Sequence, residues 1–461
     1  MLYWFASRNT LKVQNIIILF SSYVFYGWWD WRFLSLIIFS TLVDFTIGKM
    51  LAKTNILAEK KLLLWVSIIV NLGLLGFFKY YNFFIENFIA TFSFFGKDIQ
   101  PNTLNIILPV GISFYTFQTL SYTIDVYKNR LNPTNDFIAF AAFVSFFPQL
   151  VAGPIERAKS LLPQFSKTKL FNPKEAIDGL RQILWGLFKK IVIADNCAEY
   201  ANLIFNNPGD YNSISLFIGA VLFAFQIYCD FSGYSDIAIG IAKLFGYKLM
   251  KNFAFPYFSR NVGEFWRRWH ISLSTWFRDY LYIPLGGSKG SSFLKIRNTF
   301  IIFLVSGFWH GANWTFIIWG ALNAIYFLPL LLLKKNRSYL DTVAEGKIIP
   351  SFKEILQISS TFLVTVFAWI FFRSESLSHA FIYISGLLEL TFFESPQILP
   401  YSLFMLLVFF ILIEWIGRTN EHAIEKITNV SRPLQWLFYY VLIILMFTYT
   451  GKEQEFIYFQ F

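Results

Sequence analysis

The chain contains the uncharged stretch NTFIIFLVSGFWHGANWTFIIWGALNAIYFLPLLLL, residues Asn298–Leu333. A helix that spans a membrane needs about 20 mostly apolar residues, and the apolar run from Phe300 to Leu333 exceeds that length. His310 follows Arg297 by about 13 residues, or roughly 20 Å along a helix. If the segment starts at the cytoplasmic face, His310 lies near mid-membrane. The stretch therefore predicts a membrane protein with a deeply placed histidine.

The composition of the whole chain supports a membrane location. Of its 461 residues, 56% are hydrophobic and only 15% are charged, whereas soluble domains carry about 25% charged residues. The core of a soluble protein of this length is too small to bury so much apolar surface. The two cysteines, Cys197 and Cys229, and the four histidines are too scattered for a disulfide framework or a recognisable metal motif. We therefore expect no metal site.

Further apolar segments follow one another along the chain. They predict an all-α, polytopic integral membrane protein with roughly 10–13 membrane helices, several of them short, tilted or re-entrant. The sequence shows no repeat and no linker, so we expect a single membrane domain over residues 1–461. Besides Phe300–Leu333, the predicted segments are Val13–Trp29, Phe33–Phe45, Leu62–Phe78, Ile106–Ile124, Phe137–Val151, Ile183–Ile193, Ile214–Tyr228, Leu356–Phe372, Phe381–Phe393, Leu403–Ile413 and Leu434–Tyr449.

The positive charge of the chain indicates its topology. The net charge is +11, and the basic side chains lie in short loops, above all in Glu156–Lys190 and Lys243–Arg297. The positive-inside rule places both loops on the cytoplasmic side, and it explains the charge without a nucleic-acid partner. A functional alternative is that these loops attract a polyanionic donor such as coenzyme A. Topology alone accounts for the charge, so both interpretations remain open.

His310 is the strongest candidate for chemistry. A neutral imidazole is the natural general base near pH 7, and ionisable groups inside apolar segments are costly and usually functional. The neighbouring Asn313, Trp309 and Trp314 favour a site. The alternative is helix packing through Gly307 and Gly311, which have small-xxx-small spacing, with the histidine hydrogen-bonded between helices.

A second histidine lies in GEFWRRWHISLSTWFRD, residues 263–279. Read as one helix, this stretch places its aromatic side chains and His270 on one face, with arginines on an adjacent stripe. The pattern is typical of a membrane-surface anchor. The functional alternative places the histidine and arginines beside an anionic donor. The donor-binding candidates are Trp266, Arg267, Trp269 and Arg278.

Two polar clusters interrupt other apolar segments. Gln226 and Asp230 are four residues apart and share a helix face, and Gly233 follows at a point where a helix could break. Gln118 and Tyr122 have the same spacing in an earlier segment. Each pair could line a polar path, or tunnel, through the membrane. Each could equally form hydrogen bonds that hold helices together.

Several common chemistries lack their motifs in this sequence. It contains no Walker-type phosphate loop, no glycine-rich dinucleotide turn and no Gly-x-Ser-x-Gly elbow. The residues alone therefore fit two classes of protein. One is a membrane enzyme with a buried base, and the other is a proton-coupled transporter that uses His310 as a relay.

The sequence resembles the membrane-bound O-acyltransferase family, in its bacterial branch that O-acetylates alginate and other exported polysaccharides. Long matching motifs occur in order along nearly the whole chain, and such a series is highly specific. Relatives usually begin with an additional apolar segment before the region that matches Leu2. The motifs are LPVGISFYTFQTLSYTIDVY from Leu108, SFFPQLVAGPIERAKSLLPQF from Ser145, QIYCDFSGYSDIAIGIAKLFGY from Gln226, FPYFSRNVGEFWRRWHISLSTWFRDYLYIPLGG from Phe255, SGFWHGANWTFIIWGALNA from Ser306, AWIFFRSESLSHA from Ala368 and the closing FIYFQF.

The resemblance implies helices around a funnel or tunnel with a histidine at its depth. It assigns that histidine to His310 and the second family histidine to His270. It also implies a cytoplasmic thioester donor, acetyl-coenzyme A or an acyl-carrier thioester, and no bound cofactor. We expect His270 to position the donor or assist proton movement, and Asn313 to orient His310 or the thioester carbonyl.

The resemblance further implies an O-acyltransferase in the bacterial cytoplasmic (inner) membrane that acetylates a cell-surface polysaccharide, alginate-like or peptidoglycan. Its expected surroundings are membrane lipids, and its expected partner is a separate periplasmic transferase. D-alanyl transfer to teichoic acid from a carrier protein is an alternative within the family. The proton-coupled transporter remains the alternative of another class.

Overall fold

The structure is a computed structural model that describes residues 2–6, 10–94, 104, 106–389, 391, 394–451 and 454–457. Throughout these ranges the regular secondary structure is helical, and no strand occurs in them. The predicted all-α fold class is confirmed for this part of the chain. The end of the predicted segment Phe381–Phe393 and parts of the closing FIYFQF motif lie outside the described residues.

The chain divides into two compact units. Unit 1 comprises Met1–Ala176 with Ile241–Met250, and unit 2 comprises Ile177–Gly240 with Lys251–Phe461. Two helices, α9 (Pro173–Phe188) and α11 (Ser213–Leu244), have residues in both units. The single membrane domain over residues 1–461 stays a prediction, as does a central funnel.

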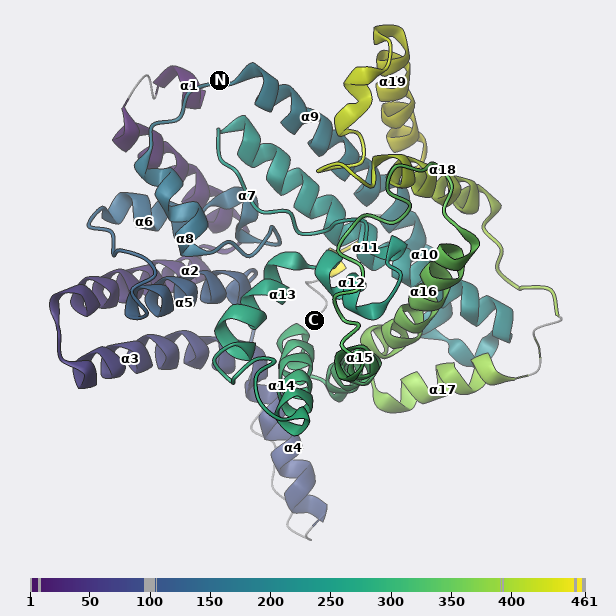
Figure 1. The fold of residues 1–461 in the computed structure, drawn as a ribbon, viewed down its shortest axis with the longest axis horizontal. Coiled ribbons are helices and arrows are strands. Elements are labelled where there is room, and N and C mark those ends of the chain that lie inside the picture. The colour runs from purple at the N-terminus through teal and green to yellow at the C-terminus, as the bar shows by residue number, and fades with distance from the viewer. Residues whose placement is uncertain are drawn as a thin grey trace. The chain divides into compact units, whose positions relative to one another are not determined.

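Unit 1 is built around α2, which packs on α3, α5 and α6 (Figure 1). The backbone of α2 leaves helical geometry at Asp30 (φ −157°, ψ 107°), which separates the predicted segments Val13–Trp29 and Phe33–Phe45. The elements of this unit are α1 (Leu2–Ala6), α2 (Leu11–Lys53), α3 (Leu57–Leu75), a π-helix (Gly76–Tyr80), α4 (Tyr81–Phe94), α5 (Ile112–Tyr127), α6 (Phe137–Val144), α7 (Phe147–Leu150), α8 (Ala158–Leu161) and a 3₁₀-helix (Leu162–Ser166).

A buried polar network joins the three long helices of unit 1. The Asp44 carboxylate of α2 accepts hydrogen bonds from Ser67 Oγ (2.6 Å) and Asn71 Nδ2 (2.8 Å) of α3. Asn71 Oδ1 accepts from Thr119 of α5 at 3.1 Å and from Ser40 of α2 at 3.0 Å. These side chains bond one another from uninterrupted stretches of helix, which is the arrangement of interhelical hydrogen bonding. We call them the Asp44 network.

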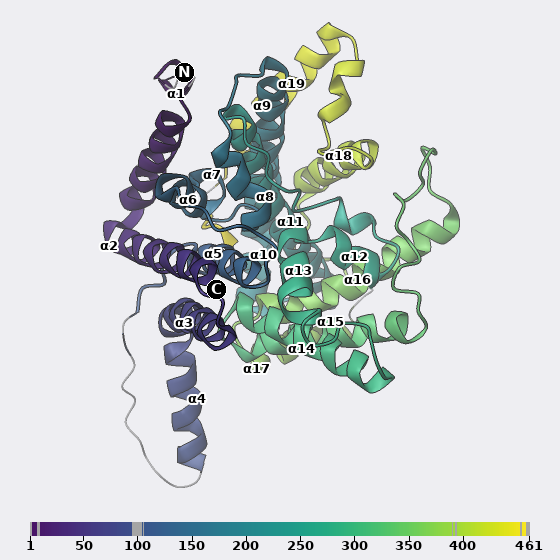
Figure 2. The same cartoon turned by 60° about the vertical axis from the view of Figure 1, so that its left-hand side comes forward.

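Unit 2 holds a large aromatic and aliphatic core. In it α14 packs on α15, and α15 packs on α16 (Figure 2). The elements of this unit, with parts of α9 and α11, are a π-helix (Lys189–Ala194), α10 (Asp195–Asn206), a 3₁₀-helix (Pro208–Asp210), a 3₁₀-helix (Pro256–Phe258), α12 (Val262–Arg268), α13 (Ile271–Phe277), a π-helix (Arg278–Tyr282), α14 (Ser292–His310), α15 (Trp314–Leu332), α16 (Phe352–Arg373), α17 (Leu377–Leu388), α18 (Tyr401–Gly417), a 3₁₀-helix (Glu425–Asn429) and α19 (Arg432–Thr448).

Five described helical spans are long and apolar enough to cross a membrane: Leu11–Lys53, Leu57–Ser93, Ser213–Leu244, Trp314–Leu332 and Phe352–Arg373. Four shorter apolar helices accompany them, at Phe137–Leu150, Leu377–Leu388, Tyr401–Gly417 and Arg432–Thr448. Large apolar side chains are exposed along these helices, for example Phe447 at 82% and Ile416 at 72%. Such surfaces require a lipid environment, and they confirm the predicted polytopic membrane protein.

The prediction of one continuous membrane helix over Phe300–Leu333 is wrong. The helix ends at His310, Gly311 adopts an extended conformation (φ −162°, ψ 154°), and a new helix begins at Trp314. The apolar pattern continues across this turn, so the sequence conceals it.

The break makes a tight hairpin of α14 and α15. A Cβ atom on Gly307 would lie 2.2 Å from the carbonyl oxygen of Phe316, and one on Gly320 would lie 2.4 Å from that of Phe303. The glycines therefore allow the two backbones to touch.

Gly233 does not break its helix, which continues from Ser213 to Leu244. Instead, a Cβ atom on Gly233 would lie 2.8 Å from the Gly186 carbonyl oxygen, and one on Gly186 would lie 2.6 Å from the Gly233 carbonyl oxygen. The glycine therefore brings α9 and α11 into backbone contact within unit 2.

Candidate active site

His310 ends α14 in an aromatic enclosure. Its ring centroid lies 5.2 Å from that of Trp319 on α15 and 5.2 Å from that of Phe372 on α16. Trp309 packs beside it at 5.0 Å. Only 4% of the residue is exposed. The helical hairpin and α16 thus fix the imidazole in apolar surroundings that exclude most water.

His270 lies at a second helix break. The prediction of one amphipathic helix over residues 263–279 is wrong, because α12 ends at Arg268 and α13 begins at Ile271. His270 has left-handed backbone angles (φ 42°, ψ 55°), a conformation that costs energy for a residue other than glycine. Strain of this kind persists where surrounding contacts enforce it, and it is common at functional sites.

The two breaks bring the two histidines together. The ring centroids of His270 and His310 are 6.5 Å apart, and that of Trp309 lies 6.1 Å from His270. Burial lowers the pKa of His270 to about 3, so this imidazole is neutral at physiological pH. The structure therefore places both predicted histidines side by side in unit 2. Their catalytic roles stay predictions.

Asn313 has a structural position in the hairpin. Its Oδ1 accepts a hydrogen bond from the Thr315 amide at 3.0 Å, which caps the start of α15. Its Nδ2 donates to the Glu375 carbonyl oxygen at 2.7 Å. Both contacts are to backbone groups, so a role in orienting His310 stays a prediction.

The predicted donor-binding residues lie in different settings. Trp266 and Trp269 pack in the aromatic core, against Trp319 (5.7 Å) and Trp369 (5.0 Å) respectively. Arg267 donates at 2.6 Å to two backbone carbonyl oxygens of the loop after α15, those of Asn336 and Tyr339.

The side chain of Arg278 is 55% exposed and pairs with the carboxylate of Asp279 at 2.7 Å. Of the two predicted arginines, Arg278 is therefore the one whose charge faces the surroundings. Donor binding by any of the four residues stays a prediction.

The predicted tunnel-lining residues fall into both units. In unit 1, Gln118 donates to the Phe143 carbonyl oxygen at 2.6 Å, and Tyr122 is fully buried against Phe140, with ring centroids 4.6 Å apart. In unit 2, Gln226 and Asp230 are buried in α11. Whether any of these four residues lines a tunnel stays a prediction.

Asp230 takes part in an ion-pair cluster of unit 2. It accepts from Lys190 at 3.0 Å and from the Ile457 amide at 2.8 Å. A buried carboxylate requires such a partner, so these contacts by themselves fit a structural role.

The residues that hold His270 were not predicted from the sequence. Asn252 Oδ1 lies 3.0 Å from His270 Nδ1 and accepts from Ser272 Oγ at 2.8 Å. Asn252 Nδ2 donates to Ser235 Oγ of α11 at 3.1 Å. Asn252 lies 18 residues before the histidine, in a loop without a recognisable motif, so no sequence signal marked it.

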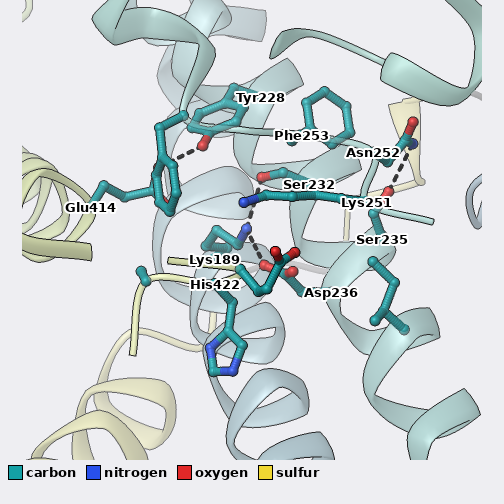
Figure 3. Close-up of a pocket in the computed structure, with 14 residues that line it drawn as sticks. Lys189, Tyr228, Ser232, Ser235, Asp236, Lys251, Asn252, Phe253, Glu414 and His422 are labelled. Carbon is teal, nitrogen blue, oxygen red and sulfur yellow. Dashed lines mark hydrogen bonds and ion pairs between the residues drawn. The ribbon is translucent and has the colours of Figure 1, made fainter. Parts of the chain in front are cut away.

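A small polar pocket borders Asn252 on the side of α11 (Figure 3). Lys189 reaches into it and pairs with Asp236 at 2.5 Å and with Ser232 Oγ at 3.0 Å. The Tyr228 hydroxyl donates to the Glu414 carboxylate at 2.5 Å. The pocket has room of about 20 Å³, enough for roughly one water molecule. It is too small for a thioester substrate.

No cluster of three or more histidine, cysteine, aspartate or glutamate side chains with metal-binding geometry occurs among the residues that the structure describes. The paired histidines supply two imidazoles in an apolar, largely buried site. Proton transfer and hydrogen bonding to a hydroxyl are the reactions that such groups perform.

Comparisons with known proteins assign this chain to a family. A model of the membrane-bound O-acyltransferase family (MBOAT) matches residues 131–367, which include both histidines. The probable alginate O-acetylase AlgI of Pseudomonas aeruginosa is 42% identical over 375 residues, which cover 80% of this chain and 68% of the relative. The chain belongs to the membrane-bound O-acyltransferase family. The resemblance seen in the sequence motifs is therefore confirmed.

Two further relatives bear on the activity of this family member. The peptidoglycan O-acetyltransferase of Helicobacter pylori is 38% identical over 410 residues, which cover 83% of this chain and 75% of the relative. The teichoic acid D-alanyltransferase of Bacillus subtilis is 29% identical over 294 residues, covering 60% and 71% respectively. The protein is therefore a multi-pass membrane O-acyltransferase, and the predicted enzyme class is confirmed. Membership of this family favours the enzyme over the transporter.

Proposed function

We propose that this membrane-bound O-acyltransferase moves an acetyl group from a cytoplasmic thioester donor across the membrane for the O-acetylation of an exported cell-surface polysaccharide. The observation that carries the proposal is the buried pair His270–His310, with ring centroids 6.5 Å apart, in a chain 37–42% identical to probable alginate O-acetylases. The similarity of 38% to a peptidoglycan O-acetyltransferase supports acetyl as the acyl group. The polysaccharide that is finally acetylated is alginate-like or peptidoglycan.

In this proposal His310 acts as the general base. It removes the proton from the acceptor hydroxyl while the oxygen attacks the thioester carbonyl carbon. The carbon–sulfur bond then breaks, and the leaving thiolate takes the proton from the imidazolium. The thiol and the new ester leave the enzyme with no net gain or loss of protons.

The aromatic enclosure of His310 supports this chemistry. Trp319 and Phe372 hold the ring from two helices, so little reorganisation is needed when the substrates arrive. Apolar walls also keep water from the thioester and so limit its hydrolysis. Positioning of the substrates and a general base of matched pKa together supply most of the rate enhancement.

The donor enters from the basic loops that the positive-inside rule assigns to the cytoplasm. Acetyl-coenzyme A is the proposed donor, and long-range attraction by the net positive charge of these loops would raise its local concentration. The contacts of Arg267 with two backbone carbonyl oxygens favour a role in holding the loop after α15. A carrier-protein thioester is the competing donor, because a teichoic acid D-alanyltransferase is also a relative.

The proposed location is the bacterial cytoplasmic membrane, with a periplasmic transferase as a partner that passes the acetyl group to the polymer. This division of labour supplies an acceptor on the outer side for a donor on the inner side. The contribution of the membrane protein is then acyl transfer across the bilayer.

The test uses purified protein in nanodiscs with labelled acetyl-coenzyme A. We expect the native protein to release coenzyme A thiol and His310→Ala to lose that release. Release that does not depend on His310 would refute the base assignment. Release from a carrier-protein thioester and not from acetyl-coenzyme A would replace the proposed donor.

A further inference from the structure

The loop residue Asn252 binds both the backbone and the side chains of the segment that carries His270. Its carbonyl oxygen accepts from the Ile271 amide at 2.9 Å. Its Oδ1 accepts from the Ser272 amide at 3.3 Å and from Ser272 Oγ at 2.8 Å. These bonds satisfy the amides of the first turn of α13, which have no partners inside the helix. Figure 3 shows the other end of the side chain, where Asn252 faces Ser235.

This geometry fixes which atom of the Asn252 amide faces His270. A backbone N–H can only donate a hydrogen bond, so the atom that meets the Ser272 amide must be the oxygen. The same oxygen lies 3.0 Å from His270 Nδ1. Because an amide oxygen can only accept, this contact requires the hydrogen on Nδ1. Ser272 Oγ also lies 3.4 Å from Nδ1, but its hydrogen is donated to Asn252 Oδ1 at 2.8 Å. The neutral imidazole therefore has its lone pair on Nε2.

We propose that Asn252 is a positioning residue for acyl transfer, which holds His270 as the Nδ1–H tautomer and leaves the lone pair on Nε2. The inference rests on the proposed function and makes it more specific. In this tautomer, His270 Nε2 can accept a hydrogen bond from the acceptor hydroxyl beside His310. It cannot donate one to the thioester carbonyl oxygen until it has taken up a proton. His270 therefore orients the acceptor and does not polarise the donor.

The surroundings of His270 make the tautomer measurable. Among the described residues, rings close to it are those of Phe231 of α11 at 4.6 Å, Phe253 at 6.3 Å, Trp309 at 6.1 Å and His310 at 6.5 Å. Of these, His310 is titratable, and the lowered pKa of His270 has burial as its cause. The chain has four histidines in all, so few imidazole signals need to be assigned.

The first experiment measures the tautomer directly and needs no activity. Protein labelled with ¹⁵N-histidine is examined in nanodiscs by long-range ¹H–¹⁵N correlation, and the signals of His270 are assigned by their loss in His270→Gln. We expect protonated Nδ1 and unprotonated Nε2 at pH 7. A protonated Nε2 would overturn the proposal.

The second experiment separates positioning from a purely structural role. Asn252→Asp keeps an acceptor for His270 and Ser272 but adds a negative charge, which raises the pKa of His270. We expect Asn252→Asp to retain thiol release at high pH and to lose it at acidic pH, where His270 becomes protonated. Asn252→Leu should lose on the order of 100-fold at every pH. A pH profile of Asn252→Asp identical to that of the native protein would refute the positioning role.

Asn196→Leu is the matched control. Asn196 is another polar residue of unit 2, and its side chain bonds backbone carbonyl oxygens of Val192 and Tyr449 at 3.0 and 2.9 Å. This variant should leave the tautomer and the pH profile unchanged. If the native protein releases no thiol from any donor, the proposed function fails, and the tautomer is still decided by the spectrum. A wrong tautomer together with normal thiol release refutes only the role of Asn252.

Discussion

Polar groups inside the apolar helices occur in two contrasting arrangements. In the Asp44 network of unit 1, a carboxylate, an amide and hydroxyls lie on uninterrupted stretches of α2, α3 and α5, where they bond one another. In unit 2, His270 and His310 lie where helices end, and their ring contacts are mostly aromatic. Both sets are buried, so burial alone does not distinguish polar residues with a structural role from residues with a catalytic role.

The two sets differ in the backbone that carries them, which is a continuous helix in unit 1 and a helix break in unit 2. A side chain on a continuous helix can point only towards neighbouring helices, and mutual hydrogen bonds satisfy it there. At a helix break a side chain is not confined to the face of one continuous helix, and the left-handed backbone of His270 costs energy that another contact must offset. We infer that the breaks at His270 and Gly311 mark the reactive part of the molecule.

The largest expected effect is that of His310. His310→Ala should lower the rate of thiol release by about 10²–10⁴-fold, the contribution of a general base, while the Tm in detergent stays close to that of the native protein. His310→Gln, which keeps size and polarity, should be equally inactive. Equal losses of activity and Tm in both variants would assign the histidine to packing.

The hairpin that carries His310 should be nearly as sensitive. Gly307→Ala places a methyl group where 2.2 Å separates it from the Phe316 carbonyl oxygen, so α14 and α15 must move apart. A displacement of about 1 Å at the site costs roughly 100-fold in rate.

Gly73→Ala in α3 is the control, because a Cβ atom there meets nothing within 4 Å. Its activity should be unchanged and its stability slightly raised, since alanine is the better helix former. Similar activity in the two variants would show that the hairpin does not position the histidine.

Most of these helices could be predicted from the sequence, but the breaks at His270 and Gly311 could not. Apolar runs marked most of the membrane helices, and the motifs around His270 and His310 pointed to the family. The apolar pattern continues through Gly311, and the helical periodicity continues through His270, so neither turn left a signal. The left-handed segment at His270 is bound by Asn252, which contacts α13 from a separate loop. Such tertiary contacts override local pattern.

The same limit applies to the Asp44 network. Asp44, Ser67 and Thr119 lie in three different apolar segments, and each looks like an isolated polar residue in the sequence. Their pairing became visible only when the structure placed α2, α3 and α5 together. From the sequence, a polar residue in an apolar segment could have a functional or a structural role. The hydrogen bonds between the helices indicate a structural role for the Asp44 network.

Removal of Asp44 should therefore affect stability and not chemistry. Asp44→Ala removes the carboxylate that accepts from Ser67 Oγ and Asn71 Nδ2. Ser67 Oγ retains Thr123 Oγ1 at 2.9 Å, and Asn71 Nδ2 retains the Ser67 carbonyl oxygen at 3.0 Å, so the expected cost is about 1–3 kcal/mol in all. We expect a lower Tm and an unchanged rate of thiol release per folded molecule. Glu86→Ala, which removes an exposed carboxylate of the same unit, should change neither quantity. Loss of activity at an unchanged Tm would show that a continuous helix can also carry chemistry.

The smallest expected effect concerns a helix break in unit 1. Glu156 follows the turn after α7, and its Oε1 accepts from the Met250 amide at 2.5 Å. Burial raises the pKa of Glu156 from 4.5 to about 7. The folded protein thus binds this proton more tightly than the unfolded chain does, so its stabilising effect is present below about pH 4.5 and is lost as the pH rises through about 7.

Glu156→Gln mimics the protonated form at every pH, and it should remove this loss. The Tm of the native protein should fall relative to that of Glu156→Gln between pH 5 and 8, by the equivalent of on the order of 1–3 kcal/mol. Thiol release per folded molecule should be equal in the two proteins. A variant that folds normally but loses activity would place Glu156 in the chemistry. Catalytic residues would then lie at helix breaks in both units. The two units would differ only in which polar side chains they contain.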